Sequence, residues 1–156
     1  SWVIYFSKEK RLKTNSVVQV EQHEKETGVN TYERWAKFAE QAKLHSEELR
    51  KIILRNNGKM LAYGASARSS TLLNFCKINS DQISAIIDKN PLKQGLITPG
   101  SNIPIVSLEQ GLKNIKNVDR ILLLAWNFKE EIVSDLRSAG FNGQFIVPLP
   151  NKPYIT

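Results

Sequence analysis

The sequence predicts an α/β protein with a mostly parallel sheet that is flanked by helices. Short apolar runs occur around residues 60–63, 83–88 and 120–125, and they do not alternate with polar residues. Such runs are typical of strands that are buried on both faces of a parallel sheet. Segments with helical spacing separate them, so that strands and helices alternate along the chain. This order is Rossmann-like, and a long helix and an N-terminal strand with a connector precede it.

The composition indicates a globular, soluble protein. The 156 residues are enough for one domain with a substantial core, and 41% of them are hydrophobic while 24% are charged. No apolar run approaches the ~18 residues of a membrane span, and the first residues lack the pattern of a signal peptide. The only methionine is Met60, which indicates a piece of a longer protein. The single cysteine, Cys76, favours a reducing, cytoplasmic location.

The charge pattern and the cysteine count limit the ligands and partners that the protein can bind. The 22 basic and 15 acidic residues give a net charge of +7. The lysines are scattered and form no basic stripe interleaved with aromatic residues, so we expect no nucleic-acid partner. One cysteine excludes an internal disulfide and a cysteine-rich zinc site, and the sequence has no metal-ligand spacing. Cys76 lies in the apolar segment LLNFCKI and is expected to be a packed thiol.

Residues 1–29 are expected to be the end of a preceding domain and a connector. Residues 2–6, WVIYF, are β-prone and almost wholly apolar, which predicts a strand. The polar segment that follows, residues 7–29, has no clear core pattern and is interpreted as the connector.

A long helix over residues 31–56 is expected next, within a bridging region of residues 30–58. Apolar residues recur on one side of this segment at helical spacing. Asn30 and Glu33 have the spacing of a capping box at its start. Gly58 is expected to end it, because glycine accepts the left-handed conformation past a helix end.

Residues 59–156 are expected to form the Rossmann-like domain itself. We expect strands within KMLAYG, QISAIIDKN, IPIVS, DRILLLAWN and GQFIVPLP, and helices over residues 70–78, 108–113 and 128–139. Ser107 is expected to cap the second of these helices, and Gly140 to stop the third.

The turn after the first strand of this domain is the most informative stretch. GASARSS agrees with the dinucleotide-binding pattern G-x-G-x-x-G only at Gly64, because Ser66 and Ser69 replace the other two glycines. Small residues still leave backbone amides open at a helix N-terminus, which favours an anion, and Arg68 could add a bidentate contact to phosphate. The alternative is structural: Gly64 makes a tight turn and Ser69 or Ser70 caps the helix. The pattern alone leaves both interpretations open.

Two further strand ends carry candidate residues, because ligands of such sheets bind outside the carboxyl ends of the strands. Asp88 lies 24 residues after Gly64, where a dinucleotide fold holds a ribose hydroxyl, but DKNP is also good turn chemistry. Trp126 could form a wall for a flat ring or could pack in the core. Asn127 and Glu130 have the spacing of a helix cap. The sequence shows no paired carboxylates and no Ser-His-Asp order, so we expect these residues to hold a ligand and assign no catalytic residue.

Four ordered blocks resemble a known family: YGASARSSTLLNFCKI, IIDKNPLKQGLITPGSNIPI, ILLLAWNFKEEI and GQFIVPLP. Over about residues 60–150 they are similar to the C-terminal domain of the S-adenosylmethionine-dependent C-methyltransferases that act on nucleotide-linked deoxysugars. The resemblance implies a parent enzyme with a cysteine-rich zinc domain, a methyl-donor domain and this domain. It implies that the parent methylates C3 of a nucleotide-linked 4-keto-6-deoxysugar, with S-adenosylmethionine and the catalytic base in the methyl-donor domain. The present chain would then hold no cofactor and would be inactive by itself.

The resemblance assigns sugar-nucleotide binding to eight residues of this sequence: Gly64, Ser66, Arg68, Ser69, Asp88, Lys93, Trp126 and Asn127. The implied partners are a nucleotide-diphosphate sugar, with thymidine diphosphate as the expected carrier, and the methyl-donor domain of the same protein. The family commonly has lysine where Arg68 stands and glycine near Ser69 or Ser70, so that the charge is kept while the fork geometry differs. The alternative is a non-catalytic nucleotide- or NAD-binding Rossmann module.

Overall fold

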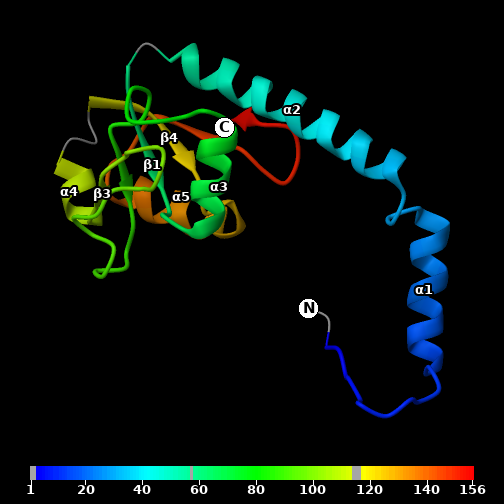
Figure 1. The fold of residues 1–156 in the computed structure, drawn as a ribbon. Coiled ribbons are helices and arrows are strands. Elements are labelled where there is room, and N and C mark those ends of the chain that lie inside the picture. Colours follow the sequence, from blue (N-terminus) through cyan, green and yellow to red (C-terminus); the bar gives the residue numbers. More distant parts are fainter. Residues whose placement is uncertain (1–2, 57, 114–116) are drawn as a thin grey trace. The chain divides into compact units, whose positions relative to one another are not determined.

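The computed structural model describes residues 3–56, 58–113 and 117–156. The chain divides into two compact units, Ser1–Ala42 and Lys43–Thr156. The boundary between them falls inside the long helix α2 (Tyr32–Leu54), which is drawn in cyan in Figure 1.

The first unit contains one further helix and no strand among its described residues. Residues 3–14 have no regular structure, and α1 (Asn15–Thr27) follows them. The strand predicted for residues 2–6 is therefore wrong for residues 3–6, and Ser1 and Trp2 lie outside the described residues. β-prone side chains form a strand only where a neighbouring backbone pairs with them, and no described segment does so here. The expected connector at residues 7–29 holds a 13-residue helix instead of only coil.

The start of α2 differs from the expected cap by one residue. The Thr31 hydroxyl accepts a hydrogen bond from the Arg34 amide at 3.3 Å, so Thr31 has the capping role that was predicted for Asn30. The Asn30 side chain instead donates to the Glu24 carboxylate at 3.3 Å. At the other end, α2 stops at Leu54, four residues before Gly58. Gly58 is not the left-handed helix stop that was predicted, and a Cβ atom there would overlap the Asp119 carboxylate.

The second unit is built on a six-stranded sheet, which confirms the predicted fold class. Its strands are β1 (Lys59–Tyr63), β2 (Ala85–Ile87), β3 (Ile105–Val106), β4 (Val118–Leu123), β5 (Gln144–Val147) and β6 (Tyr154–Ile155). Their order in the sheet is β3-β2-β1-β4-β5-β6. The first five are parallel, and β6 pairs antiparallel with β5. This is the strand order of the doubly wound dinucleotide-binding fold.

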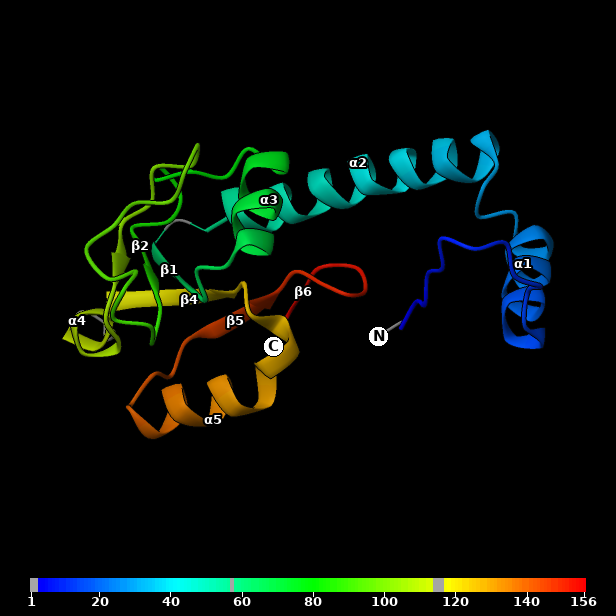
Figure 2. The ribbon, with the colours of Figure 1, turned by 60° about the horizontal axis from the view of Figure 1, so that its bottom comes forward.

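Helices cover both faces of this sheet. On one face, α3 (Ala67–Phe75) and the second half of α2 pack on alternate strand residues such as Met60 and Leu122. On the other face, α4 (Leu108–Lys113) and α5 (Lys129–Ser138) pack on the residues between them, such as Leu61 and Ile121. Figure 2 shows α3 and α5 on opposite sides of the sheet. Both faces of the central strands are thus buried, as their non-alternating apolar runs predict.

Cys76 follows α3 and is fully buried in the core on the α2 side, which confirms the prediction of a packed thiol. Burial raises the pKa of this thiol above its ordinary value, which keeps it in the neutral form.

The topology fixes where two turns meet. β1 lies between β2 and β4, so the direction in which the sheet grows reverses at the β1–β4 pair. The turns that follow β1 and β4 therefore lead to opposite faces and leave a crevice between their ends. Gly64 follows β1 directly, and the 3-10 turn η2 (Trp126–Phe128) follows β4.

Candidate functional site

Gly64 is required by the close approach of the two turns. Its φ angle is +98°, which side-chain-bearing residues rarely adopt, and a Cβ atom at this position would lie 2.6 Å from the Ala125 Cβ atom. Its amide donates to the Ile87 carbonyl at 2.8 Å and continues the pairing of β1 with β2. Gly64 thus lets the chain leave the sheet tightly, directly beside the end of β4.

Ser66 and Ser69 form a capping box at the start of α3. The Ser66 hydroxyl accepts from the Ser69 amide at 3.1 Å, and the Ser69 hydroxyl accepts from the Ser66 amide at 3.2 Å. The Ser69 hydroxyl also donates to the Gly64 carbonyl at 2.8 Å and is buried. Both side chains therefore hold the turn, as in the structural alternative, but the capping residue is Ser66 and not Ser69 or Ser70. α3 starts at Ala67 instead of Ser70 because this cap closes earlier than expected.

The same cap leaves the first amides of α3 open. Ala67 and Arg68 are exposed, and no acceptor for their amides occurs among the residues that the structure describes. The first turn of α3 contains no acidic residue that would satisfy the positive end of the helix. The turn therefore offers free donors and partial positive charge at the carboxyl edge of the sheet.

Arg68 and Trp126 bring the turns after β1 and β4 together. The guanidinium of Arg68 lies 5.6 Å from the centroid of the Trp126 ring, within the range of a cation–π contact. Within the described ranges, no carboxylate forms a salt bridge with Arg68. Trp126 is half-buried and packs in part against the core on the α5 side. The result is a positioned but uncompensated cation beside the open amides.

Asp88 and Lys93, which follow β2 in the chain, hold the turn after β1 through bonds to Ala65. The Asp88 carboxylate is buried and accepts from the Ala65 amide at 2.8 Å and from the Asn90 amide at 2.8 Å. Lys93 forms a salt bridge with Asp88 at 3.2 Å and donates to the Ala65 carbonyl at 2.7 Å. Both oxygens of Asp88 therefore have partners within the protein, where the dinucleotide pattern expects an acid free for ribose.

Asn127 does not cap a helix, contrary to the expectation from its spacing with Glu130. It lies inside the turn η2, and α5 begins only at Lys129. The residue before α5, Phe128, has no capping side chain. Asn127 is exposed and directly follows Trp126 in this turn.

A hollow of about 330 Å³ lies at the same edge of the sheet and includes residues that the sequence did not single out. Its walls include Tyr63, Lys89, Phe128 and Glu131, together with Gly64 and Ala125 of the two turns. Lys89 and Phe128 each directly follow a predicted site residue, so the rule that ligands bind at strand ends could have found them. Burial raises the pKa of the Tyr63 phenol, and the hydrogen bond to Asp135 raises the pKa of Lys89.

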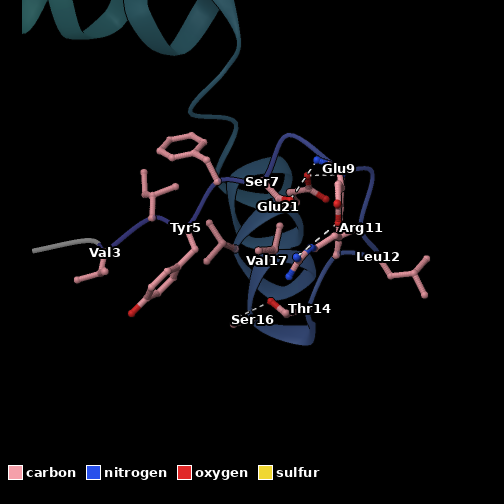
Figure 3. Close-up of a pocket in the computed structure, with 14 residues that line it drawn as sticks. Val3, Tyr5, Ser7, Glu9, Arg11, Leu12, Thr14, Ser16, Val17 and Glu21 are labelled. Carbon is pink, nitrogen blue, oxygen red and sulfur yellow. Dashed lines mark hydrogen bonds and ion pairs between the residues drawn. The ribbon is translucent and has the colours of Figure 1, made fainter.

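A larger hollow, of about 780 Å³, lies in the first unit between residues 3–14 and α1 (Figure 3). Its lining is mostly exposed, with Tyr5 91% and Phe6 90% accessible to solvent. The ion pairs on its walls, such as that of Arg11 with Glu9 at 3.7 Å, join exposed side chains. It lacks the buried, converging polar groups of a ligand site, so we place the candidate site in the second unit.

The described residues contain neither a candidate metal centre nor a candidate membrane-spanning helix. In residues 3–56, 58–113 and 117–156, no group of three or more His, Cys, Asp or Glu side chains is arranged to hold a metal ion. None of the helices in these ranges has both the length and the apolar character that crossing a membrane requires.

The chain matches a family of known proteins, and two similar proteins illustrate the likeness. The C-methyltransferase C-terminal domain family matches residues 1–150. The C-methyltransferase NovU of Streptomyces niveus is 36% identical over 126 residues, and this match covers 80% of the present chain and 30% of NovU. The chain thus spans less than a third of the length of this curated relative. The crystal structure of UDP-D-quinovosamine 4-dehydrogenase from Vibrio fischeri matches 62% of this chain and 80% of its own, with 22% identity and a TM-score of 0.46. The family match covers nearly the whole sequence, and the chain therefore belongs to the C-methyltransferase C-terminal domain family.

Proposed function

We propose that this chain is the sugar-nucleotide-binding part of an S-adenosylmethionine-dependent C-methyltransferase that acts on nucleotide-linked keto-deoxysugars. The observation that carries the proposal is Arg68, which is exposed, stacked on Trp126 and beside the open amides of α3. Free amides, the positive end of a helix and a guanidinium are the groups that bind a diphosphate. The four sequence blocks that resemble the sugar C-methyltransferases support the same substrate class.

We assign the eight candidate residues to two tasks. Arg68, Trp126 and Asn127 are exposed or half-buried at the crevice and are proposed to contact the ligand. The remaining residues are proposed to act indirectly, because their side chains or close contacts hold the turn that presents the α3 amides. These are Gly64, Ser66, Ser69, Asp88 and Lys93.

The residues do not suit the alternative, a dinucleotide-binding module. Such a module needs an acid that is free to accept ribose hydroxyls, but the Asp88 carboxylate already accepts from Ala65, Asn90 and Lys93. It also needs a second glycine where the chain has Ser66, whose side chain completes the helix cap. We therefore propose no nicotinamide cofactor and no S-adenosylmethionine site within this chain.

Methyl transfer is proposed to need the rest of the parent protein. S-adenosylmethionine supplies the methyl group, and we place its site and the catalytic base in a methyl-donor domain that is separate from these residues. Residues 3–6 are proposed to contact that domain. Val3, Ile4, Tyr5 and Phe6 are 67–91% exposed, which is unusual for four consecutive large apolar side chains.

Isothermal titration calorimetry with a thymidine-diphosphate hexose tests the proposal. Wild-type chain should bind it, and Arg68→Ala should weaken binding by about ten- to a hundredfold, since a charge-assisted contact is lost. Arg68→Lys should retain part of the affinity, because the charge remains and only the fork is lost. Arg55→Ala is the matched control, since Arg55 is an exposed arginine at the end of α2. Equal affinity of Arg68→Ala and wild type, or binding of NAD in preference to the sugar nucleotide, would contradict the proposal.

A further inference from the structure

The hollow at the β1–β4 crevice contains an unexplained buried hydroxyl. Tyr63 is only 5% exposed, and its hydroxyl group has no hydrogen-bond partner in the part of the chain that the structure describes. The same residue lines the hollow, on the face of the sheet that α5 covers. A buried hydroxyl without a partner lowers the stability of the folded state, and native proteins rarely retain one. A ligand group that enters the hollow would supply the missing partner.

The charges around this hydroxyl disfavour a phosphate group. Lys89 is the one cation in the lining of the hollow, and it pairs with Asp135 at 2.9 Å and with Glu131 at 3.6 Å. Asp88 adds a third carboxylate, which Lys93 neutralises. The acids that face Lys89 thus outnumber it, so that a dianionic phosphate would be repelled. An uncharged hydroxyl or carbonyl oxygen can instead accept hydrogen bonds from the Tyr63 phenol and from the Lys89 ammonium group, and a hydroxyl group can also donate to the Glu131 carboxylate.

The shape and the rim of the hollow suit a ring. Its volume of about 330 Å³ lies at the lower end of the range for small-ligand sites. Phe128 lines the hollow, and 60% of its surface is exposed. This is a large exposed fraction for an aromatic side chain. A flat apolar face of this kind packs against the face of a sugar or a base.

Two residues that line the hollow are close in sequence to Arg68, at the positive end of α3, and to Trp126. Gly64 lines the hollow and lies four residues before Arg68, and Ala125 lines it directly before Trp126. A diphosphate at Arg68 would therefore place an attached ring within reach of Tyr63. We propose that this hollow is the subsite for an uncharged ring of the nucleotide sugar, with the Tyr63 hydroxyl, Lys89 and Glu131 as its polar contacts. This inference rests on the proposed function and adds to it a second, neutral subsite.

Tyr63→Phe tests the subsite, because it removes only the hydroxyl group. We expect the dissociation constant for a thymidine-diphosphate hexose to rise about 2- to 12-fold, the equivalent of one hydrogen bond. The affinity for inorganic pyrophosphate should not change, since that ligand has no ring. The melting temperature of the free chain should stay the same or rise, because the hydroxyl has no partner to lose. Tyr32→Phe is the matched control, since Tyr32 is 83% exposed on α2.

Two smaller ligands identify which ring occupies the subsite. If the nucleoside binds there, Tyr63→Phe weakens thymidine diphosphate and leaves a hexose 1-phosphate unchanged. If the hexose binds there, Tyr63→Phe weakens the binding of a hexose 1-phosphate and leaves thymidine diphosphate unchanged. Equal affinities of wild type and Tyr63→Phe for all of these ligands, or a lowered melting temperature of Tyr63→Phe, would overturn the subsite. If the subsite is overturned in this way, a loss of affinity in Arg68→Ala would still support the proposed function. Failure of the wild-type chain to bind any sugar nucleotide would overturn both the subsite and the proposed function.

Discussion

The carboxylate of Asp88 accepts a hydrogen bond from the backbone amide of Ala65 at 2.8 Å. This bond joins the end of β2 to the turn after β1, across 23 residues of sequence. In a dinucleotide-binding fold, an acid at this position would instead accept a hydrogen bond from a ribose hydroxyl. The carboxylate thus fixes the start of α3, and with it the direction in which the α3 amides and Arg68 face.

Asp88→Asn should therefore lower stability more than a surface substitution does. The amide side chain keeps one acceptor but loses the charge that pairs with Lys93 and bonds to two backbone amides. We expect a loss of about 1–2 kcal/mol in the free energy of unfolding, measured by urea denaturation. Asp81→Asn, in an exposed turn, is the control. A fully stable Asp88→Asn chain with reduced ligand affinity would instead indicate that Asp88 contacts the ligand.

Residues 3–28 should contribute little to the stability of the second unit. α1 buries none of its residues, and an isolated helix of 13 residues is only marginally stable. Hydrogen exchange should be fast through residues 3–28 and slow in β1 and β4. A chain that starts at residue 29 should melt within about one degree of the full chain, because no core contact is removed. Slow exchange in residues 3–6 would show that they pair within this chain.

The sequence predicted the parallel part of the sheet well and its margins poorly. The five parallel strands were visible because each lies in a short apolar run, and the central runs are buried on both faces. β6 was missed because it consists of two residues that are both exposed, so that no apolar pattern marks it. α1 was missed for a related reason: it buries no residue and so has no apolar stripe. The strand predicted at residues 2–6 came from propensity, which supplies no pairing partner.

The location of the candidate site followed from topology, but the tasks of its residues did not. The rule that ligands bind at the carboxyl ends of strands pointed to the turns after β1, β2 and β4. Whether Asp88 is free or bonded depends on Ala65 and Lys93, and such long-range contacts leave no mark in the sequence pattern. Tyr63 was passed over because a tyrosine in an apolar run resembles any other strand residue.

The 156-residue chain should not catalyse methyl transfer by itself. The two acids that line the hollow, Asp88 and Glu131, are paired with Lys93 and Lys89, so that among the described residues no unpaired carboxylate lines it. Incubation with S-adenosylmethionine and a nucleotide-linked 4-keto-6-deoxysugar should give no methylated product by mass spectrometry. A complete C-methyltransferase of the family serves as the positive control. Methylated product from the purified chain would show that the catalytic groups are here.

Gly64→Ala should destabilise the chain through two separable effects. The positive φ angle costs about 1–2 kcal/mol for a residue with a side chain, and overlap with Ala125 adds about 1–3 kcal/mol. Gly95→Ala isolates the first effect, because Gly95 has a φ angle of +83° and no atom within 4 Å of an added Cβ. The double substitution Gly64→Ala with Ala125→Gly should recover part of the loss. Equal destabilisation in Gly64→Ala and Gly95→Ala would show that the two turns can move apart.

A double-mutant cycle on Arg68 and Trp126 should separate their coupling from their individual contributions. In the free chain Arg68 is exposed, so its stacking on Trp126 should contribute only about 0.5 kcal/mol to stability. In the complex the same contact orients the guanidinium toward the diphosphate, so the coupling measured from sugar-nucleotide affinity should be larger than the coupling measured from unfolding. Trp126→Phe keeps an aromatic face and some of the packing against the α5 side of the core, so it should lose less affinity than Trp126→Leu. Additive effects of the Arg68 and Trp126 substitutions on the dissociation constant would mean that the two side chains act independently, and that the stacking does not position Arg68 for the ligand.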